Sequence, residues 1–281
     1  MSVWLEVALN GGAGRVNQPL IPITPQEIID DGRRCAAAGA AILHVHAYDG
    51  QGRPTEDADV YSTIIEGLRT HTNAIVYPTL ALAGTVEERF APVEILAKRG
   101  LLEWCVVDPG SVNITHKRQV PAGQNGFLYA NPDAHIRKGL EIAAQYRSHP
   151  SFAVYEPGFV RLGAAWSALY DGLPQPIYRV MLSEDLLFGL PPRTYAPETY
   201  QALLHEYVPL APWMISGLGG DVTKIIEPSL QKGAHIRVGL EDAGFGSEKT
   251  NLELVQEAVS MIGQFGHTLA TAEDIRRALA P

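Results

Sequence analysis

The stretch from residue 24 to residue 46 contains a helix signal followed by a strand signal, which together form one unit of an α/β fold. It opens with Thr24-Pro25-Gln26-Glu27 and closes with Ala41-Ile42-Leu43-His44-Val45-His46. The threonine can cap a helix, the proline fits the first turn, and Glu27 can complete a capping box. The closing run is apolar apart from its histidines, which predicts a buried strand.

The same alternation of short apolar runs and amphipathic stretches extends along the whole chain, which is typical of a parallel sheet with crossover helices. Eight such units match the size of a (β/α)8 TIM barrel, and we predict this fold as a single domain over residues 1–281. An open doubly wound sheet has a similar periodicity, so the prediction depends on the count of eight. The predicted strands are Val3 to Leu9, Ala41 to His46, Ala74 to Thr79, Glu103 to Asp108, Ser151 to Glu156, Ile177 to Leu182, Trp213 to Gly217 and His235 to Glu241.

Composition and charge narrow the class of protein. The 281 residues are 46% hydrophobic and 19% charged, and the formal net charge is −9. This describes an ordinary globular chain, and the acidic balance argues against nucleic acid or an anionic membrane as the main partner. The two cysteines, Cys35 and Cys105, suggest no disulfide framework, and no export signal or membrane span is indicated. We therefore expect a cytoplasmic protein.

The histidines of the second predicted strand point to a metal centre. Side chains two residues apart on a strand face the same way, so His44 and His46 can aim two imidazoles at one point. A catalytic zinc site usually has three protein ligands, and one carboxylate would complete this set. In a closed barrel the first strand lies between the second and the eighth, so Glu241 is the candidate. The small residues that follow the first strand leave room there: Asn10-Gly11-Gly12-Ala13-Gly14.

An arginine on the last predicted strand needs a partner. Strand alternation puts Arg237 on the same face as Glu241, inside the barrel. Burying an unpaired guanidinium is very costly, so we expect a carboxylate beside it. Asp242 is close in sequence and is the candidate.

Several segments together resemble the β-keto acid cleavage enzymes, a family that includes the 3-keto-5-aminohexanoate cleavage enzyme. The resemblance covers nearly the whole chain. The matching segments are Pro22-Ile23-Thr24-Pro25, His44-Val45-His46, Gly50-Gln51-Gly52-Arg53-Pro54-Thr55, Glu88-Arg89-Phe90-Ala91-Pro92, Gly110-Ser111-Val112-Asn113, Gly233 to Asp242, and Asn251 to Val255.

The resemblance implies a zinc-dependent TIM barrel, usually a homotetramer, that reacts a β-keto acid with acetyl-CoA to give acetoacetate and a new acyl-CoA. Asp242 matches the family's base, and Arg237 matches the arginine that positions it. Ser111 and Asn113 fall where the family holds the substrate's oxygens. Thr79, after the third strand, is a further candidate for a polar contact with the substrate.

Two further expectations concern the substrates. The turn Gly217-Leu218-Gly219-Gly220 follows the seventh strand and precedes a helical run from Asp221, so Gly217, Gly219 and Gly220 can cradle part of CoA. Family members commonly have an arginine where this chain has Gly220. The aminohexanoate enzyme has a glutamate after its first strand, but the stretch from Gly12 to Arg15 contains no acid. Arg15 would oppose a cation if it pointed inward, so we expect a neutral or acidic β-keto acid.

Other interpretations remain open from sequence. An amidohydrolase-like hydrolase also places paired histidines on a barrel strand, although on its first strand and with further ligands at later strand ends. A non-catalytic metal-binding barrel is another alternative. Glu241 and Asp242 alone are compatible with a solvated strand end, and Ser111 and Asn113 with the cap of a turn.

Overall fold

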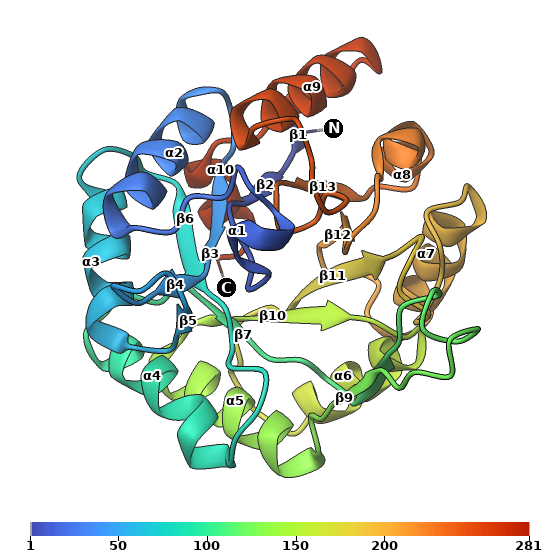
Figure 1. The fold of residues 1–281 in the computed structure, drawn as a ribbon. Coiled ribbons are helices and arrows are strands. Elements are labelled where there is room, and N and C mark those ends of the chain that lie inside the picture. Colours follow the sequence, from blue (N-terminus) through green and yellow to red (C-terminus); the bar gives the residue numbers. More distant parts are fainter. Residues whose placement is uncertain (1, 281) are drawn as a thin grey trace.

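Eight parallel strands curl into a nearly closed barrel in the computed structural model, which describes residues 2–280 (Figure 1). Hydrogen bonding runs in the order β6-β3-β2-β13-β12-β11-β10-β7. The first barrel strand therefore lies between the second and the last, as the closed fold requires. The barrel strands are β2 (Leu5–Ala8), β3 (Ile42–Val45), β6 (Ile75–Pro78), β7 (Trp104–Val106), β10 (His149–Val154), β11 (Ile177–Leu182), β12 (Trp213–Gly217) and β13 (His235–Val238).

Strands β6 and β7 stand at the two ends of this hydrogen-bonding order. The ring of Tyr77, on β6, lies 5.6 Å from the ring of Trp104, on β7. Aromatic packing therefore joins the two strands where the hydrogen-bonded order ends.

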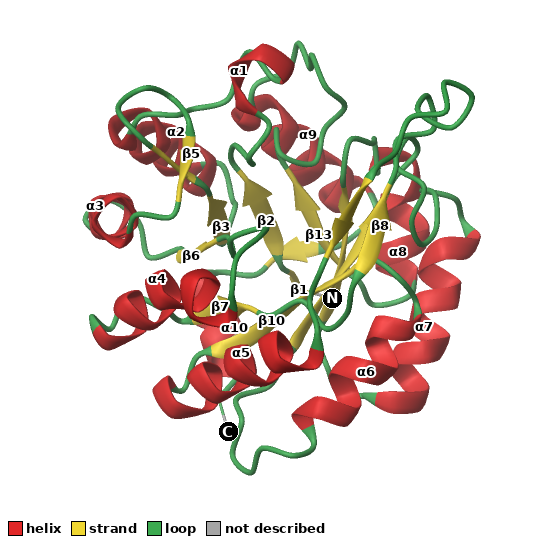
Figure 2. Cartoon of the chain, turned by 60° about the horizontal axis from the view of Figure 1, so that its bottom comes forward, coloured by secondary structure: helices red, strands yellow, loops and turns green. Residues whose placement is uncertain are grey.

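Helices surround the barrel and cover its outer face (Figures 1 and 2). The capping box predicted at Thr24 is present, because its side chain accepts from the backbone of Glu27 and the glutamate returns a hydrogen bond to the Thr24 N–H. The helices are α1 (Gly14–Asn17), α2 (Pro25–Ala37), α3 (Ala58–Arg69), α4 (Val86–Lys98), α5 (Asp133–Tyr146), α6 (Gly158–Ser167), α7 (Tyr195–Tyr207), α8 (Ile226–Gln231), α9 (Asn251–Gln264) and α10 (Ala272–Ala278), with a 3₁₀ turn at Thr223–Ile225.

Three small two-stranded sheets supplement the barrel, and the sequence pattern did not predict them. One is parallel and joins the two ends of the described chain, while the other two are antiparallel hairpins that follow β3 and β7. The hairpins extend the loops at the carboxyl ends of the strands, where barrel active sites lie. The pairs are β1 (Ser2–Val3) with β14 (Thr268–Leu269), β4 (Ala47–Tyr48) with β5 (Pro54–Thr55), and β8 (Val112–Ile114) with β9 (Phe127–Tyr129).

The eight predicted strands are all present. The structure corrects the end of the eighth strand and the start of the helix that precedes it. The eighth strand ends at Val238 rather than at Glu241, because Gly239 has a φ of +136° and turns the chain out of the ladder. The helix expected from Asp221 starts only at Ile226, after a 3₁₀ turn. Cys35 and Cys105 are both buried and free.

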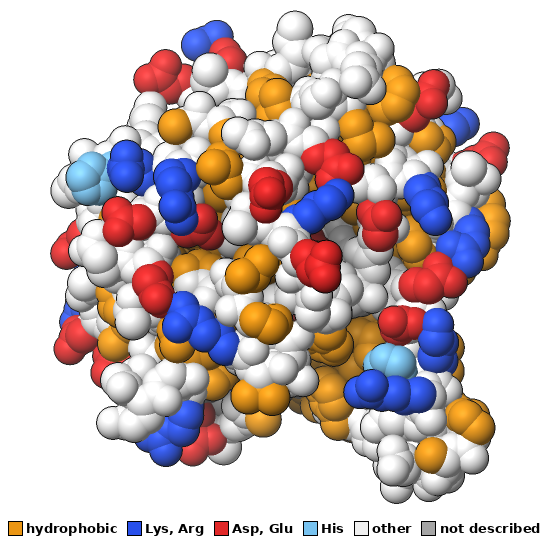
Figure 3. All heavy atoms as spheres, turned by 45° about the horizontal axis from the view of Figure 1, so that its top comes forward, with side chains coloured by type: hydrophobic (Ala, Val, Ile, Leu, Met, Phe, Trp, Pro, Cys, Tyr) orange, Lys and Arg blue, Asp and Glu red, His pale blue; other side chains and the backbone are white. Residues whose placement is uncertain are grey.

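The surface carries charges of both signs, intermixed on the face shown in Figure 3. In that view a lobe at the lower right is set off from the main body by a hollow. None of the helices in residues 2–280 has the length and apolar character that a membrane span requires.

Candidate metal centre and active site

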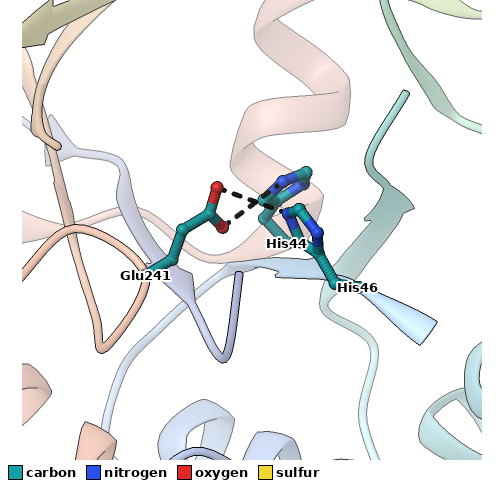
Figure 4. A group of neighbouring side chains, drawn as sticks. All are labelled: His44, His46 and Glu241. Atoms are coloured by element: carbon teal, nitrogen blue, oxygen red, sulfur yellow. Dashed lines mark ion pairs between the residues drawn. The ribbon is translucent and has the colours of Figure 1, made fainter. Parts of the chain in front are cut away.

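His44, His46 and Glu241 converge on one point at the carboxyl ends of the barrel strands (Figure 4). Nε2 of His44 lies 3.5 Å from Oε2 of Glu241, and Nε2 of His46 lies 3.4 Å from Oε1 of the same carboxylate. One ligand atom from each residue lies within 4.8 Å of the other two. The spacing and the barrel closure thus bring these three residues together as the sequence predicted.

Strand register and two glycines make this convergence possible. Ala8 of β2 pairs with His44, and Val7 of β2 pairs with Val238, so the residues after β2 lie between the ligand-bearing segments. Gly11 has a φ of +65°, and a Cβ there would lie 2.7 Å from Cγ of Glu241. A Cβ at Gly239 would lie 2.2 Å from the carbonyl oxygen of Ala8. A larger residue at Gly11 would therefore push against Glu241, and one at Gly239 would collide with the backbone of β2.

Asn10 fixes the backbone of the second histidine. Its Nδ2 donates to the carbonyl oxygen of His46 at 2.9 Å, and its Oδ1 accepts from the His46 N–H at 2.9 Å. Asn10 is almost fully buried and also bonds the carbonyl oxygen of Pro22. The Tyr48 hydroxyl donates to the carbonyl oxygen of Gly11 at 2.5 Å. The loop after β2 is therefore held against the strand that carries the histidines.

The donor set fits a divalent cation. Nε2 of His46 and Oε2 of Glu241 are buried and have no hydrogen-bond partner among residues 2–280, and Nε2 of His44 faces the same carboxylate. Burial lowers the pKa of His44 well below its usual value, which keeps that imidazole neutral and able to ligate a metal. Two imidazoles and one carboxylate form a ligand set that suits zinc and similar metals.

Arg237 lies beside this group at the centre of a buried cluster of charges. Its Nε and Nη2 form a bidentate pair with Asp242, with an Nη2 to Oδ1 distance of 2.7 Å. Its Nη1 lies 3.2 Å from Oε1 of Glu6, and its Nη2 lies 3.3 Å from Oε1 of Glu241. The predicted pairing of Arg237 with Asp242 is confirmed. One guanidinium faces three carboxyl groups, so the cluster carries an excess of negative charge. A divalent cation would offset this excess.

The buried cluster shifts the pKa values of the adjacent acids Glu241 and Asp242 in opposite directions. Burial raises the pKa of Glu241, but Arg237, His44 and His46 outweigh it and hold the pKa well below its usual value. Burial raises the pKa of Asp242 to about 7, with Glu241 and Glu6 acting in the same direction and Arg237 opposing them. Glu241 is therefore a permanent carboxylate, whereas Asp242 is suited to accept and release a proton near neutral pH.

Glu6 and Tyr77 also belong to the cluster, and the sequence pattern did not predict either of them. The Tyr77 hydroxyl donates to Oε1 of Glu6 at 2.6 Å, and the Tyr77 ring lies 4.6 Å from the ring of His44. Glu6 is fully buried on β2. A charged residue inside the apolar run from Val3 to Leu9 was the available signal for Glu6.

The predicted substrate residues lie on loops at the same end of the barrel. Ser111 and Asn113 are exposed on the segment that leads into and forms β8, after β7. Oγ of Ser111 accepts from the Asn131 N–H at 2.8 Å, which leaves its own proton available. Thr79 follows β6 and is partly exposed. No two of these three residues are joined by a hydrogen bond in the described part of the chain.

The glycine-rich turn after β12 closes against the loop after β13. The Gly220 N–H donates to the carbonyl oxygen of Asp242 at 3.0 Å, so this amide is already engaged and cannot bind a phosphate. Gly219 has a φ of +65° and stands at the bend of the turn. Gly220 and Asp242 also line a cavity of about 310 Å³ between the two loops, which reaches Phe245 and Lys249.

Fold and site together define a class of protein: a nearly closed (β/α)8 barrel with a candidate His/His/Glu metal centre at the carboxyl ends of its strands. The chain belongs to the beta-keto acid cleavage enzyme family, whose model matches residues 2–280.

Similar proteins agree with this assignment. The chain is 24% identical to the 3-keto-5-aminohexanoate cleavage enzyme of Fusobacterium nucleatum, with 94% of this chain and 92% of that protein covered. It is 23% identical to the 3-oxoadipate:acetyl-CoA acetyltransferase of Cupriavidus necator, with 98% and 93% covered. Among solved structures, ObcA in complex with oxaloacetate has a TM-score of 0.74 at 17% identity, covering 93% of this chain and 67% of that one. The likeness to ObcA concerns the fold alone.

Proposed function

We propose that this protein transfers groups between a β-keto acid and acetyl-CoA, giving acetoacetate and a new acyl-CoA. The observation that carries the proposal is the convergence of His44, His46 and Glu241 directly beside a buried Asp242 that is paired with Arg237. Family membership and the acetyl-CoA transferase named above support it.

His44, His46 and Glu241 would hold the metal ion, and zinc is our candidate among divalent ions. When bound, such an ion acts as a Lewis acid that polarises the ketone of a β-keto acid. The excess of carboxyl groups over the single guanidinium of Arg237 favours a divalent ion at this point.

Asp242 is the proposed base. It would take the proton from the carbon between the ketone and the carboxylate, and the carbanion would attack the acetyl carbonyl and expel CoA thiolate. The thiolate would then attack the original ketone and break its bond to that carbon, giving the new acyl-CoA. Asp242 would return the proton to the released carbanion, giving acetoacetate. Arg237 holds the Asp242 carboxylate in one orientation through two hydrogen bonds from its guanidinium. Because both residues are buried, this geometry does not depend on solvent.

Ser111, Asn113 and Thr79 are the proposed contacts to the substrate's oxygens. A hydroxyl and an amide can both donate to a carboxylate or to a developing enolate. The Ser111 proton remains available for this, because its oxygen is an acceptor in the bond to Asn131.

Arg89 connects the loops that carry these residues. It is 1% exposed, and its Nε donates to the carbonyl oxygen of Ala81 at 2.6 Å, two residues beyond Thr79. Its Nη1 donates to the carbonyl oxygen of Ala130 at 3.0 Å, just after β9. The neighbouring Tyr129 lies in hydrogen-bond contact with Asp108. Arg89 is therefore a positioning residue that ties the loop after β6 to the β8–β9 hairpin.

Arg89→Met is expected to raise KM for the β-keto acid about tenfold or more, because the two loops lose their shared anchor. Metal content should not change, since no metal ligand contacts Arg89 through a described hydrogen bond. Initial rates and metal analysis measure the two effects. Arg99→Met, at a partly exposed arginine nearby in sequence, is the control. An unchanged KM in the Arg89 variant would show that this arginine only stabilises the fold.

Gly217, Gly219 and Gly220 remain our proposed contacts for CoA, with the role of Gly220 changed. Its amide is occupied, but its position on the wall of the 310 Å³ cavity lets it border an incoming pantetheine arm. Asp242 lines the same cavity, so a thioester carried along it arrives beside the proposed base.

The preferred substrate is proposed to be a neutral or acidic β-keto acid. The stretch from Gly12 to Arg15 contains no acid that could hold a cationic group of the substrate. Arg15 itself forms an ion pair with Glu27, at 2.8 Å, so it does not supply the repulsion that an inward arginine would. The proposal therefore depends on the missing acid alone.

A panel of neutral, acidic and amino β-keto acids, each assayed with acetyl-CoA, tests the function. We expect acetoacetate to form, with the highest kcat/KM for a neutral or acidic compound. A preference for an amino compound would overturn the substrate class. Turnover without CoA would favour the hydrolase interpretation, and no turnover with any compound would favour a non-catalytic barrel. We also propose a homotetramer, which sedimentation measurements test.

A further inference from the structure

Arg179 places a second buried guanidinium inside the barrel. It lies on β11, is 3% exposed, and pairs in the sheet register with Ala153 of β10. Its Cζ lies 5.6 Å from the centre of the Tyr77 ring, which belongs to β6, a strand that is not adjacent to β11. The side chain therefore points into the barrel and not toward the helices. No carboxylate of residues 2–280 lies within ion-pair distance of it.

Most of the hydrogen-bonding capacity of this guanidinium is unused. Nη2 donates to the carbonyl oxygen of Ser151 at 3.2 Å, while Nε is buried without an acceptor. Nη1 has no acceptor in the described chain either, but it keeps some accessible surface, and that surface faces the interior of the barrel. Buried polar groups are nearly always paired, and an unpaired buried charge is costly. The arginine therefore indicates an anionic acceptor that enters the barrel.

The Tyr155 hydroxyl is a second donor on the same side of the barrel. Tyr155 follows β10 two residues after Ala153, so strand alternation turns it toward the same interior as Arg179, one step nearer the carboxyl ends. Its ring is packed edge-on against Tyr129 and Phe188, at 5.7 and 5.2 Å, and its hydroxyl forms no hydrogen bond with a described residue. Burial raises the pKa of Tyr155, so the hydroxyl stays protonated and can donate.

Both donors lie close to the candidate metal centre. The Tyr77 ring, 5.6 Å from Cζ of Arg179, lies 4.6 Å from the ring of His44, so one aromatic ring neighbours both residues. The charge of Glu241 adds to the burial that raises the pKa of Tyr155, which places the hydroxyl within electrostatic reach of this ligand. A molecule whose ketone lies at His44 and Glu241 can therefore extend its far end toward Arg179 and Tyr155.

Asp108 is an acid near these donors, but its oxygens are already engaged. Its charge acts on the pKa values of both Arg179 and Tyr155. The Tyr129 hydroxyl donates to one of its oxygens, and the Ala153 N–H donates to the other. The donors of Arg179 and Tyr155 are thus left for another acceptor. An arginine presents its N–H groups in a planar fork that matches a carboxylate, and the phenol adds one more donor.

We propose that Arg179 and Tyr155 form an anionic subsite that holds a carboxylate at the far end of the β-keto acid. This inference rests on the proposed function, because the ketone must lie at the metal centre for the far end to reach the subsite. The substrate class is then a dicarboxylic β-keto acid, and the acyl group that passes to CoA keeps the second carboxylate. Arg179 and Tyr155 determine specificity, since they bind the end of the substrate where no bond changes.

Length-matched pairs of substrates test the proposal. We compare 3-oxohexanedioate with 3-oxohexanoate, and 3-oxoheptanedioate with 3-oxoheptanoate, each assayed with acetyl-CoA. For the better pair, kcat/KM of the diacid should exceed that of the monoacid about tenfold or more, because the monoacid leaves a charged hydrogen-bond donor without its partner. Calorimetric titration of the same pairs without acetyl-CoA measures binding alone.

Variants assign the preference to the two donors. Arg179→Met should lower kcat/KM for the better diacid about tenfold or more and change the matching monoacid less than about threefold. Arg179→Lys keeps the charge without the fork, so it should keep part of the preference. Tyr155→Phe should lower the value for the diacid selectively and by a smaller factor. Arg33→Met and Tyr195→Phe are the matched controls, at exposed residues of α2 and α7, and should change neither substrate.

The outcomes separate this inference from the proposed function. Equal kcat/KM for diacids and monoacids, with acetoacetate formed from both, would overturn the subsite and leave the function standing. A preference that persists in folded Arg179→Met and Tyr155→Phe proteins would overturn the subsite as well. If no compound is turned over, the proposed function fails and calorimetry decides on the subsite. Stronger binding of the diacid, lost in Arg179→Met, would support it, and equal binding of diacid and monoacid to the wild type would overturn it.

Discussion

Asp242→Asn is expected to lower kcat by about 10²- to 10⁴-fold, the usual contribution of a general base. The substitution keeps the size of the side chain and an oxygen that accepts from Arg237, but it removes the ability to take a proton. Neither the buried contact to Arg237 nor the ligands His44 and His46 should move. Steady-state kinetics with acetyl-CoA and the best β-keto acid measure the effect, and metal analysis of the same sample checks the centre.

Asp57→Asn is the matched control for this variant. Asp57 is exposed before α3, and its Oδ1 accepts from the Asp59 N–H at 2.8 Å, a bond that asparagine can also accept. Its kcat should therefore equal that of the wild type. A loss of less than about tenfold in Asp242→Asn would exclude Asp242 as the base, given the size of general-base effects.

Arg237→Met is expected to reduce the free energy of unfolding by about 3–5 kcal/mol, because it removes one partner of a buried ion-pair cluster. The guanidinium is 1% exposed and contacts Asp242, Glu6 and Glu241. Methionine fills much of its volume but leaves three buried carboxylates without a counter-charge. Urea unfolding of the metal-free protein measures the loss.

Arg179→Met is the control for this variant. It removes a buried guanidinium of the same size that has no carboxylate partner, so it measures the effect of the lost side chain without stranded charges. Arg179 is also buried, on β11, but no carboxylate lies within ion-pair distance of it among residues 2–280, and its Nε has no hydrogen-bond partner. Replacing Arg179 should lower the free energy of unfolding clearly less than replacing Arg237 does. Adding Glu6→Gln to Arg237→Met should restore part of the stability, because it removes one of the stranded charges. Equal losses in the two arginine variants would contradict the role given to the carboxylates.

The sequence predicted the barrel because strand and helix signals repeat eight times, and closure then determined which strands are neighbours. It did not predict where β13 ends, because Gly239 leaves the strand through a backbone angle that glycine alone tolerates easily. The β8–β9 hairpin was missed as well, since its strands have three residues each and are joined by a long loop. Short pairings of this kind lack a periodic signal.

The candidate site was predicted to the extent that it follows from alternation and closure. His44 and His46 share a face by their spacing, and Glu241 reaches them because β13 and β3 flank β2. Glu6 and Tyr77 were missed, although Glu6 is a visible charge in an apolar run. Alternation tells which side chains point into a barrel, but not which ones meet across it. That information comes from the register of strands far apart in sequence.

The metal content of the wild type and of the His46→Ala variant decides whether the three converging side chains hold an ion that the reaction needs. We expect about one divalent ion per chain in the wild type, and loss of both the ion and acetoacetate formation in a folded variant. Acetoacetate formation by metal-free protein, or a full complement of metal in the His46→Ala variant, would contradict it.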